Sequence, residues 1–447
     1  MPESREALEA QLNDFNAARR RAALEALLER VARGHIVLPE PGHAVNMHCH
    51  TFFSYNGYGY SPTYIAWRAR CEGLRAAGVV DFDVLDAADE FLEACAALGL
   101  RGCAGVETRV FIEPFEAREI NSPGEPGISY HMGVGFTTGA IADPVLAEFK
   151  ATAQARNQGV LARVNPFLAP ATLDYARDVL PLTPNGNPTE RHVCMAYDAK
   201  ARECYPDDES RAAFWAEKLG VAIADVRAAL HDAPALQGLI RSKTMKAGGV
   251  GYVKPKGRDF PALPKVNAFI RSANAIPTLT WLDGLSEGEQ AIEELLDLMM
   301  ADGVAAVNII PDRNWNVKDP DVKKTKVDRL HAFVELTRSH DLPIIVGTEM
   351  NAHGQRFVDD FDAPEMRPLA PLFLEGAHIV YAHTLLQANA GMGYLSEWAT
   401  AHFASARDRN AFFNKVGEAM PPGRVDTLAL IDPKMTPAQV LAQVQTS

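Results

Sequence analysis

Val45-Asn46-Met47-His48-Cys49-His50-Thr51 is an apolar run that carries two histidines, His48 and His50, at its end. Successive side chains of a β-strand point to opposite faces, so residues two positions apart share a face. Two imidazoles on one face of a strand end suit a divalent ion such as zinc, manganese or iron. The motif therefore predicts a strand that ends in a metal site.

Short apolar runs alternate with helical stretches along much of the chain. Alternation of this kind is typical of a parallel sheet with crossover helices. Eight or so such units with polar residues at the strand ends favour a closed barrel over an open sheet. The predicted strands cover 44–49, 78–82, 103–107, 131–136, 248–253, 276–281, 304–310, 343–348 and 378–382.

The chain divides by pattern into an N-terminal helical segment, a barrel and an insertion. Residues 1–40 hold one amphipathic helix over 4–33, where apolar residues recur at helical spacing. The barrel takes 41–137 and 246–447. Between them, 138–245 breaks the strand–helix rhythm and is mostly helical, so we expect an insertion that caps the mouth of the barrel.

Composition excludes several classes of function. The net charge of −13 argues against a nucleic-acid surface, which needs an excess of Lys and Arg. The six cysteines show no spacing typical of a zinc knot or a disulfide framework. The charged N-terminus is not a signal peptide. The sequence has no run of eighteen apolar residues, which is the length that spanning a membrane requires. We therefore expect a cytoplasmic protein with no membrane or nucleic-acid partner.

Further polar residues stand at the ends of other predicted strands. Glu107, which follows Gly-Val, and Glu349, which follows Gly-Thr, end predicted strands, and His131 begins another. Because the carboxyl ends of barrel strands converge on one face, these side chains are expected to meet His48 and His50. The sequence thus predicts a metal site with several ligands.

Three other residues keep more than one interpretation. Asp81 and Asp83, at the end of the second predicted strand, either ligate an ion or bond to neighbouring backbone amides. His383, at the end of the last predicted strand, is a ligand, a general acid or base, or a core histidine.

In order, His-x-His-Thr-x-x-Ser (48–54), Asp-x-Asp (81–83), Gly-x-Glu (105–107) and then His131 resemble the signature of the polymerase and histidinol phosphatase (PHP) superfamily. The resemblance covers residues 44–136 well and 246–352 more loosely. It implies a distorted (β/α)7 TIM-like barrel and two or three metal ions that activate water against phosphate esters.

Ligand roles follow from this resemblance residue by residue. His48, His50, Glu107 and Glu349 match the ligands of the first ion, with Glu349 where the family normally has Asp. Glu107 would also bridge to a second ion, which His131 would bind.

The departures from the family pattern concern the third ion. Family histidines are replaced by Phe82, Asn56 and Asn351, and the Ala-His-Pro motif aligns with Thr280-Trp281-Leu282. The resemblance therefore implies a centre with one or two divalent ions (Zn, Mn or Fe).

Cations near the predicted strand ends are candidates for binding an anionic substrate, because positive charge stabilises charge that develops in the transition state. Arg109 shares a face with Glu107, and Tyr60 lies on a loop close to the histidine motif. Arg241 and Lys243 precede the glycine-rich run 248–251, and Lys254 follows it. Asn308 and Arg313 are further candidates at the mouth of the barrel.

The functional prediction is a metal-dependent hydrolase, with a phosphoesterase of a small anionic molecule placed first. Arg109 and Lys254 would hold the anion with support from Arg241, and Glu349 or His383 would carry the proton. One alternative is a metal-dependent hydrolase or lyase of a C–N or C–O bond in a carboxylated small molecule. Another is a barrel that binds a ligand without turnover. The sequence leaves the oligomeric state, including a homo-oligomer, open.

Overall fold

A computed structural model describes residues 3–141 and 143–445. The chain forms two compact units. The barrel unit contains Met1–Thr51, Asn56–Asp143 and Gly257–Ser447, and the helical unit contains Phe52–Tyr55 and Pro144–Lys256. Every residue of the candidate site described below belongs to the barrel unit.

Seven strands of the barrel unit form one nearly closed sheet, whose spatial order follows the chain from β1 to β7. The strands are β1 (Val45–Cys49), β2 (Ala76–Phe82), β3 (Arg101–Phe111), β4 (Ile128–Val134), β5 (Ile276–Trp281), β6 (Ala306–Ile309) and β7 (Ile344–Val346). Neighbouring strands are parallel except at β4, which runs antiparallel to both β3 and β5. The predicted distorted TIM-like barrel is thus confirmed, while the expectation of an all-parallel sheet is wrong at β4.

The two edges of the sheet meet between β1 and β7. Cys49 forms an isolated parallel bridge with Glu349, just beyond β7. A Cβ atom at Gly347 would lie 2.4 Å from the Cβ of His48, so only glycine lets the two backbones approach this closely. This approach brings the residues after β7 to the end of β1.

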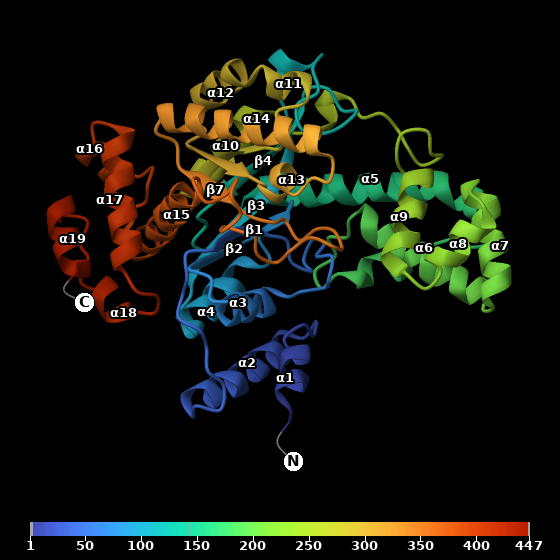
Figure 1. The fold of residues 1–447 in the computed structure, drawn as a ribbon, viewed down its shortest axis with the longest axis horizontal. Coiled ribbons are helices and arrows are strands. Elements are labelled where there is room, and N and C mark those ends of the chain that lie inside the picture. The colour runs from blue at the N-terminus through green and yellow to red at the C-terminus, as the bar shows by residue number, and fades with distance from the viewer. Residues whose placement is uncertain (1–2, 142, 446–447) are drawn as a thin grey trace. The chain divides into compact units, whose positions relative to one another are not determined.

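Helices surround the sheet in the barrel unit (Figure 1). They are α1 (Arg5–Gln11), α2 (Ala17–Ala32), α3 (Pro62–Cys71), α4 (Ala88–Leu98), α10 (Leu263–Ser272), α11 (Glu287–Gln290), α12 (Ile292–Ala301), α13 (Asp312–Trp315), α14 (Pro320–Ser339), α15 (Ala370–Ala390), α16 (Glu397–His402), α17 (Ala406–Ala419), α18 (Val425–Leu428) and α19 (Pro437–Gln445). Local sequence sets several of their starts. Ser61, for example, caps α3 by accepting the Tyr64 N–H at 2.9 Å, with Pro62 as the first helical residue.

Two predicted elements of the barrel unit differ from the structure. The single helix over 4–33 is two helices, because the side chain of Asn16 caps a new helix by accepting the N–H groups of Ala18 and Arg19. The strand over 378–382 is instead part of α15, a helix buried on most sides. A helix that is buried on most sides has apolar residues all round, so its sequence shows no helical period. The run 378–382 therefore resembled a strand.

The helical unit has its own core. Its helices are α5 (Pro144–Leu168), α6 (Glu190–Cys204), α7 (Asp208–Leu219), α8 (Ile223–Ala229) and α9 (Ala233–Thr244). Trp215, Tyr197 and Val164 are fully buried among them. The strand predicted over 248–253 is wrong, because this run folds back in turns in which Gly251 N–H donates to Thr244 O and Tyr252 N–H to Gly249 O.

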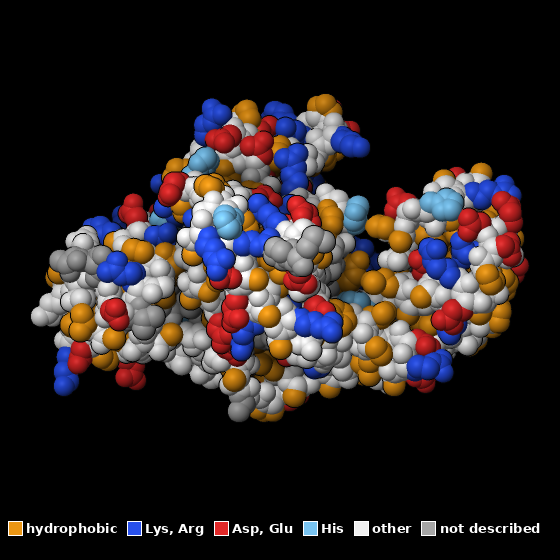
Figure 2. Space-filling view, turned by 90° about the horizontal axis from the view of Figure 1, so that it is seen from below, with side chains coloured by type: hydrophobic (Ala, Val, Ile, Leu, Met, Phe, Trp, Pro, Cys, Tyr) orange, Lys and Arg blue, Asp and Glu red, His pale blue; other side chains and the backbone are white. Residues whose placement is uncertain are grey.

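The surface carries both signs of charge. On the face drawn in Figure 2, Lys and Arg side chains lie among Asp and Glu side chains. Exposed ion pairs such as Lys324–Asp328, at 2.5 Å, contribute little stability each. Within 3–141 and 143–445, no helix combines the length and the apolar character that crossing a bilayer requires.

Candidate metal centre

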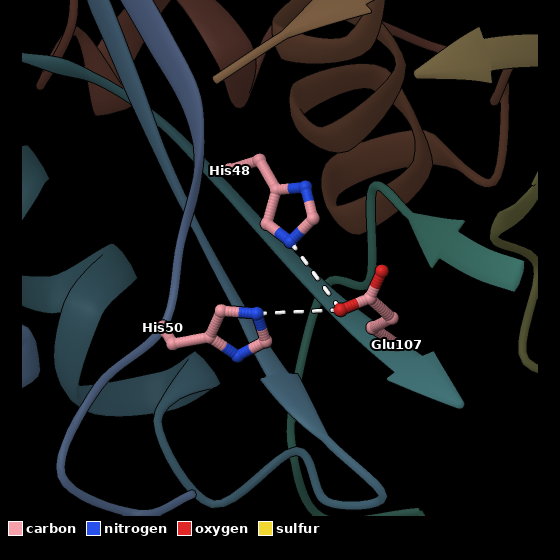
Figure 3. Close-up of side chains that lie close together, drawn as sticks. All are labelled: His48, His50 and Glu107. Atoms are coloured by element: carbon pink, nitrogen blue, oxygen red, sulfur yellow. Dashed lines mark ion pairs between the residues drawn. The ribbon is translucent and has the colours of Figure 1, made fainter. Parts of the chain in front are cut away.

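Two strands bring three metal-ligating side chains together at one end of the barrel. His48 and His50 come from β1 and its end, and Glu107 comes from β3 (Figure 3). The Glu107 Oε2 atom lies 3.7 Å from His48 Nε2 and 3.3 Å from His50 Nε2. One ligand atom of each residue lies within 4.8 Å of the others, and all three side chains are buried. We call this set the three-ligand cluster.

The three-ligand cluster fits a divalent ion. Ligands bound at about 2.0–2.1 Å in a tetrahedron lie about 3.3 Å apart, close to the distances observed. Neither nitrogen of His48, nor Oε2 of Glu107, has a hydrogen-bond partner among the described residues. Buried polar atoms without partners are costly, and an ion held between them would satisfy them.

Charges within the three-ligand cluster are coupled. Burial raises the pKa of the Glu107 carboxyl, but His48 and His50 outweigh it and bring that pKa down to about 2. Burial lowers the pKa of His48, whereas Glu107 and Glu349 outweigh burial and raise it. Without an ion, Glu107 is therefore ionised and His48 holds a proton more tightly than usual.

We expect opposite pH dependences for the stability of the metal-free and metal-loaded protein. The raised pKa of His48 stabilises the metal-free protein below pH 6.5, and this contribution is lost as pH rises through the raised value. A metal ion that binds His48 must displace the same proton. The affinity of the protein for the ion therefore rises with pH until His48 is deprotonated, by up to about tenfold per pH unit. Thermal unfolding with and without chelator, between about pH 6 and about pH 8, measures the difference. A difference in midpoint that does not grow with pH would contradict the assignment of His48.

His131 faces away from the three-ligand cluster. In the antiparallel pair of β3 and β4, Glu107 lies opposite Met132, and Thr108 lies opposite His131. Opposed residues share a face, so His131 lies on the other face of the sheet from Glu107. Its Nε2 atom lies 2.6 Å from Oδ1 of Asn267 on α10. The structure thus does not bring His131 to the site predicted for a second ion.

Glu349 lies beside the three-ligand cluster but binds an arginine. Its Oε2 atom accepts hydrogen bonds from Arg313 Nη2 at 2.7 Å and from Gln355 Nε2 at 3.2 Å. Its backbone joins both histidines, since Glu349 N–H donates to His48 O and Glu349 O accepts from His50 N–H. The residue predicted as a ligand is therefore adjacent to the ion site, with its carboxylate held by a cation.

The second-strand residues support the three-ligand cluster. Asp81 accepts the Thr51 N–H at 2.7 Å and the Thr51 hydroxyl at 2.6 Å, so its carboxylate holds both the backbone and the side chain of the residue after His50. Phe82 stacks on the ring of His50 at 4.1 Å between centroids. Together they orient His50. Of the two interpretations, Asp81 fits the bonding one.

His383 is a buried helix residue whose two ring nitrogens both have backbone partners. Nε2 lies 3.0 Å from Gly135 O, and Nδ1 accepts the Tyr394 N–H at 2.9 Å. Burial lowers its pKa to about 4, so the ring is neutral. Placing it on a strand end was wrong, because it lies inside the helix α15, and of its interpretations this geometry fits the core histidine.

Replacing His383 by Ala is expected to lower stability by about 2–4 kcal/mol, because it leaves a cavity and two unpaired backbone groups. The bound metal should be unaffected. Denaturant unfolding and elemental analysis measure the two properties. Unchanged stability with lost turnover would instead indicate a catalytic histidine.

The predicted substrate-binding residues of the barrel unit have partners of their own. Arg109 pairs with Glu125 at 2.6 Å and lies 4.5 Å from the centroid of the Phe260 ring. The Tyr60 hydroxyl accepts from Arg68 at 2.8 Å. Most of the charge on Arg109 is thus already balanced.

The other predicted cations lie in the helical unit. Arg241 pairs with Glu190 at 3.0 Å, and Lys246 pairs with the same carboxylate at 2.7 Å. Lys243 and Lys254 are exposed. Their part in substrate binding stays a prediction.

Tyr130, which the sequence pattern did not single out, and Asn308, a candidate from the sequence, face the same interior. Tyr130 lies opposite Arg109 in the β3–β4 register and so shares the face of Glu107. Burial raises the pKa of its hydroxyl, which stays protonated. Asn308, on β6, is buried beside His48, and neither of its side-chain polar atoms has a hydrogen-bond partner within the described ranges. Asn308 could be found from its place in the apolar run of β6, whereas the inward face of Tyr130 depends on the pairing of β4 with β3.

Comparisons with known proteins give little more. No protein-family model and no curated protein matches the chain. An amidohydrolase from Chromobacterium violaceum, in a structure with bound sulfate and no metal, aligns at 17% identity and a TM-score of 0.47, over 75% of this chain and 96% of that one. A candidate metal-dependent phosphoesterase from Bifidobacterium adolescentis aligns at 18% identity and a TM-score of 0.45, over 75% and 98%. Scores this low assign no activity.

Proposed function

We propose that the chain is a metal-dependent hydrolase of a small anionic substrate, with a phosphate ester as the substrate class. The observation that carries this proposal is the buried set of two histidines and one glutamate at the end of the barrel strands. Structural zinc sites use four protein ligands, whereas catalytic sites use three and leave a position for water or substrate. Three ligands therefore favour catalysis by one ion.

The residues of the site are of two kinds, those that would hold the ion and those that position a ligand. His48, His50 and Glu107 would hold the ion, which when bound lowers the pKa of water and polarises the substrate. Phe82 and Asp81 keep His50 in place, and their support matters because ligand orientation tunes a metal site.

Tyr130 is the group that we assign to proton transfer. Its hydroxyl is protonated at neutral pH, and it lies on the same sheet face as Glu107. The Oη–H group can donate to a leaving-group oxygen. The two earlier candidates have other partners, since Glu349 holds Arg313 and His383 is bonded to backbone.

A substrate screen with metal-reconstituted protein tests the proposal. Phosphomonoesters, phosphodiesters and cyclic amides are offered to protein loaded with Zn²⁺, Mn²⁺ or Fe²⁺, and to the same protein after chelation. We expect turnover of a phosphate ester that chelation abolishes. Turnover of amides alone would move the chain to C–N bond hydrolysis, and no turnover with any metal would leave only a binding role.

A further inference from the structure

Arg313 contacts Glu349, whose backbone is hydrogen-bonded to both histidines of the three-ligand cluster. It lies on α13, just after β6, and its Nη2 atom is 2.7 Å from Glu349 Oε2. Strands β6 and β7 are parallel neighbours, so their carboxyl ends place α13 beside Glu349. The pair therefore lies at the end of the barrel that holds the three-ligand cluster.

The position of Glu349 is fixed by its backbone. Its N–H donates to His48 O at 2.8 Å, and its carbonyl accepts His50 N–H at 2.7 Å. Its φ angle of 60° lies in the left-handed region, which costs a non-glycine residue energy and often marks a functional position. A carboxylate held in this way is a rigid anchor for the guanidinium.

Burial differs between the two partners. The side chain of Glu349 is 7% exposed, whereas that of Arg313 is 44% exposed. Only one guanidinium nitrogen, Nη2, has an acceptor among the described residues. Arginine carries five N–H donors in a planar fork, so the remaining donors are available to a carboxylate or phosphate group.

The charges of the site favour an anion. Arg313 lies close enough to Tyr130 and Glu107 for both to act on it electrostatically. A divalent ion and Arg313 together carry three positive charges, and Glu107 and Glu349 carry two negative charges. With the histidines neutral, these groups sum to one net positive charge. An excess of this kind stabilises a bound anion where water is partly excluded.

We propose that Arg313, anchored by Glu349, binds the anionic group of the substrate, and that Glu349 does not ligate the ion. Glu349 is thus a positioning residue for Arg313, and not the metal ligand that the family resemblance implies. This inference rests on the proposed function in taking the substrate to be an anion.

Binding of inorganic phosphate to the full-length, metal-loaded protein tests the inference. Calorimetry compares wild type with R313M, R313K and E349Q, and elemental analysis gives the metal content of each. The control is R118M, which breaks the exposed Arg118–Glu294 pair of the same unit. We expect R313M to weaken phosphate binding roughly ten- to hundredfold and R313K to weaken it less. E349Q should keep its ion, weaken phosphate binding, and add little to R313M in the double variant.

Several outcomes would overturn the inference. They are loss of the ion in E349Q, unchanged phosphate affinity in both Arg313 variants, or a wild type that binds no phosphate. Phosphate binding that depends on Arg313 in a protein that hydrolyses no ester would overturn the proposed function and leave the inference standing.

Discussion

Replacing His48 by Ala is expected to remove the bound ion and, with it, hydrolysis. His48 supplies one of three protein ligands, and neither of its ring nitrogens has a hydrogen-bond partner in the described part of the chain. The free energy of binding a structural zinc ion, roughly 10–16 kcal/mol, is shared among a few ligands. Losing one ligand should therefore lower the affinity for the ion by roughly two to three orders of magnitude. Elemental analysis after dialysis measures the loss.

The matched control is His131→Ala. His131 is an equally buried histidine of the same barrel, but it bonds to Asn267 on the outer face of the sheet. We expect this variant to lose stability and to keep its ion. If both variants kept the ion, the three-ligand cluster would not be the metal centre. If both lost it, His131 would belong to the centre after all.

Replacing Glu107 by Gln is expected to produce a comparable loss of metal, because the neutral amide keeps the shape but removes the charge. It should also change the metal-free protein. The carboxylate raises the pKa of His48, and breaking a buried ion pair costs about 3–5 kcal/mol while the remaining partner is charged. The metal-free variant should therefore be least stable relative to wild type at acidic pH, where His48 is protonated.

Glu289→Gln is the control for Glu107→Gln. Glu289 is also buried, and it accepts backbone N–H groups of Leu282, Asp283 and Gly284. This variant should lose stability without losing the ion. A Glu107→Gln protein that bound metal as tightly as wild type would show that the carboxylate is not a ligand.

The three-ligand cluster could be predicted because strand alternation alone determines it. His48 and His50 share a face by period two, and Glu107 lies on β3 of the same sheet. The face of His131 could not be predicted in this way. The register of β4 against β3 decides which of Tyr130 and His131 points inward, and a sequence read one strand at a time does not contain that register.

The remaining differences have similar physical causes. The ion pair of Arg313 with Glu349 joins residues 36 positions apart on different elements, and only the fold brings them together. The apolar run around His383 forms the buried helix α15, which shows no polar face to reveal a helical period. The glycine-rich run 248–251 forms turns, because the conformational freedom of glycine outweighs the strand tendency of the apolar residues beside it.

The most direct test is the metal content of wild-type protein purified without chelator. Elemental analysis should find one divalent ion per chain, removed in His48→Ala and retained in His131→Ala. Two ions per chain would contradict a centre built from His48, His50 and Glu107 alone. No ion, with none taken up on addition of Zn²⁺, Mn²⁺ or Fe²⁺, would contradict the metal centre itself.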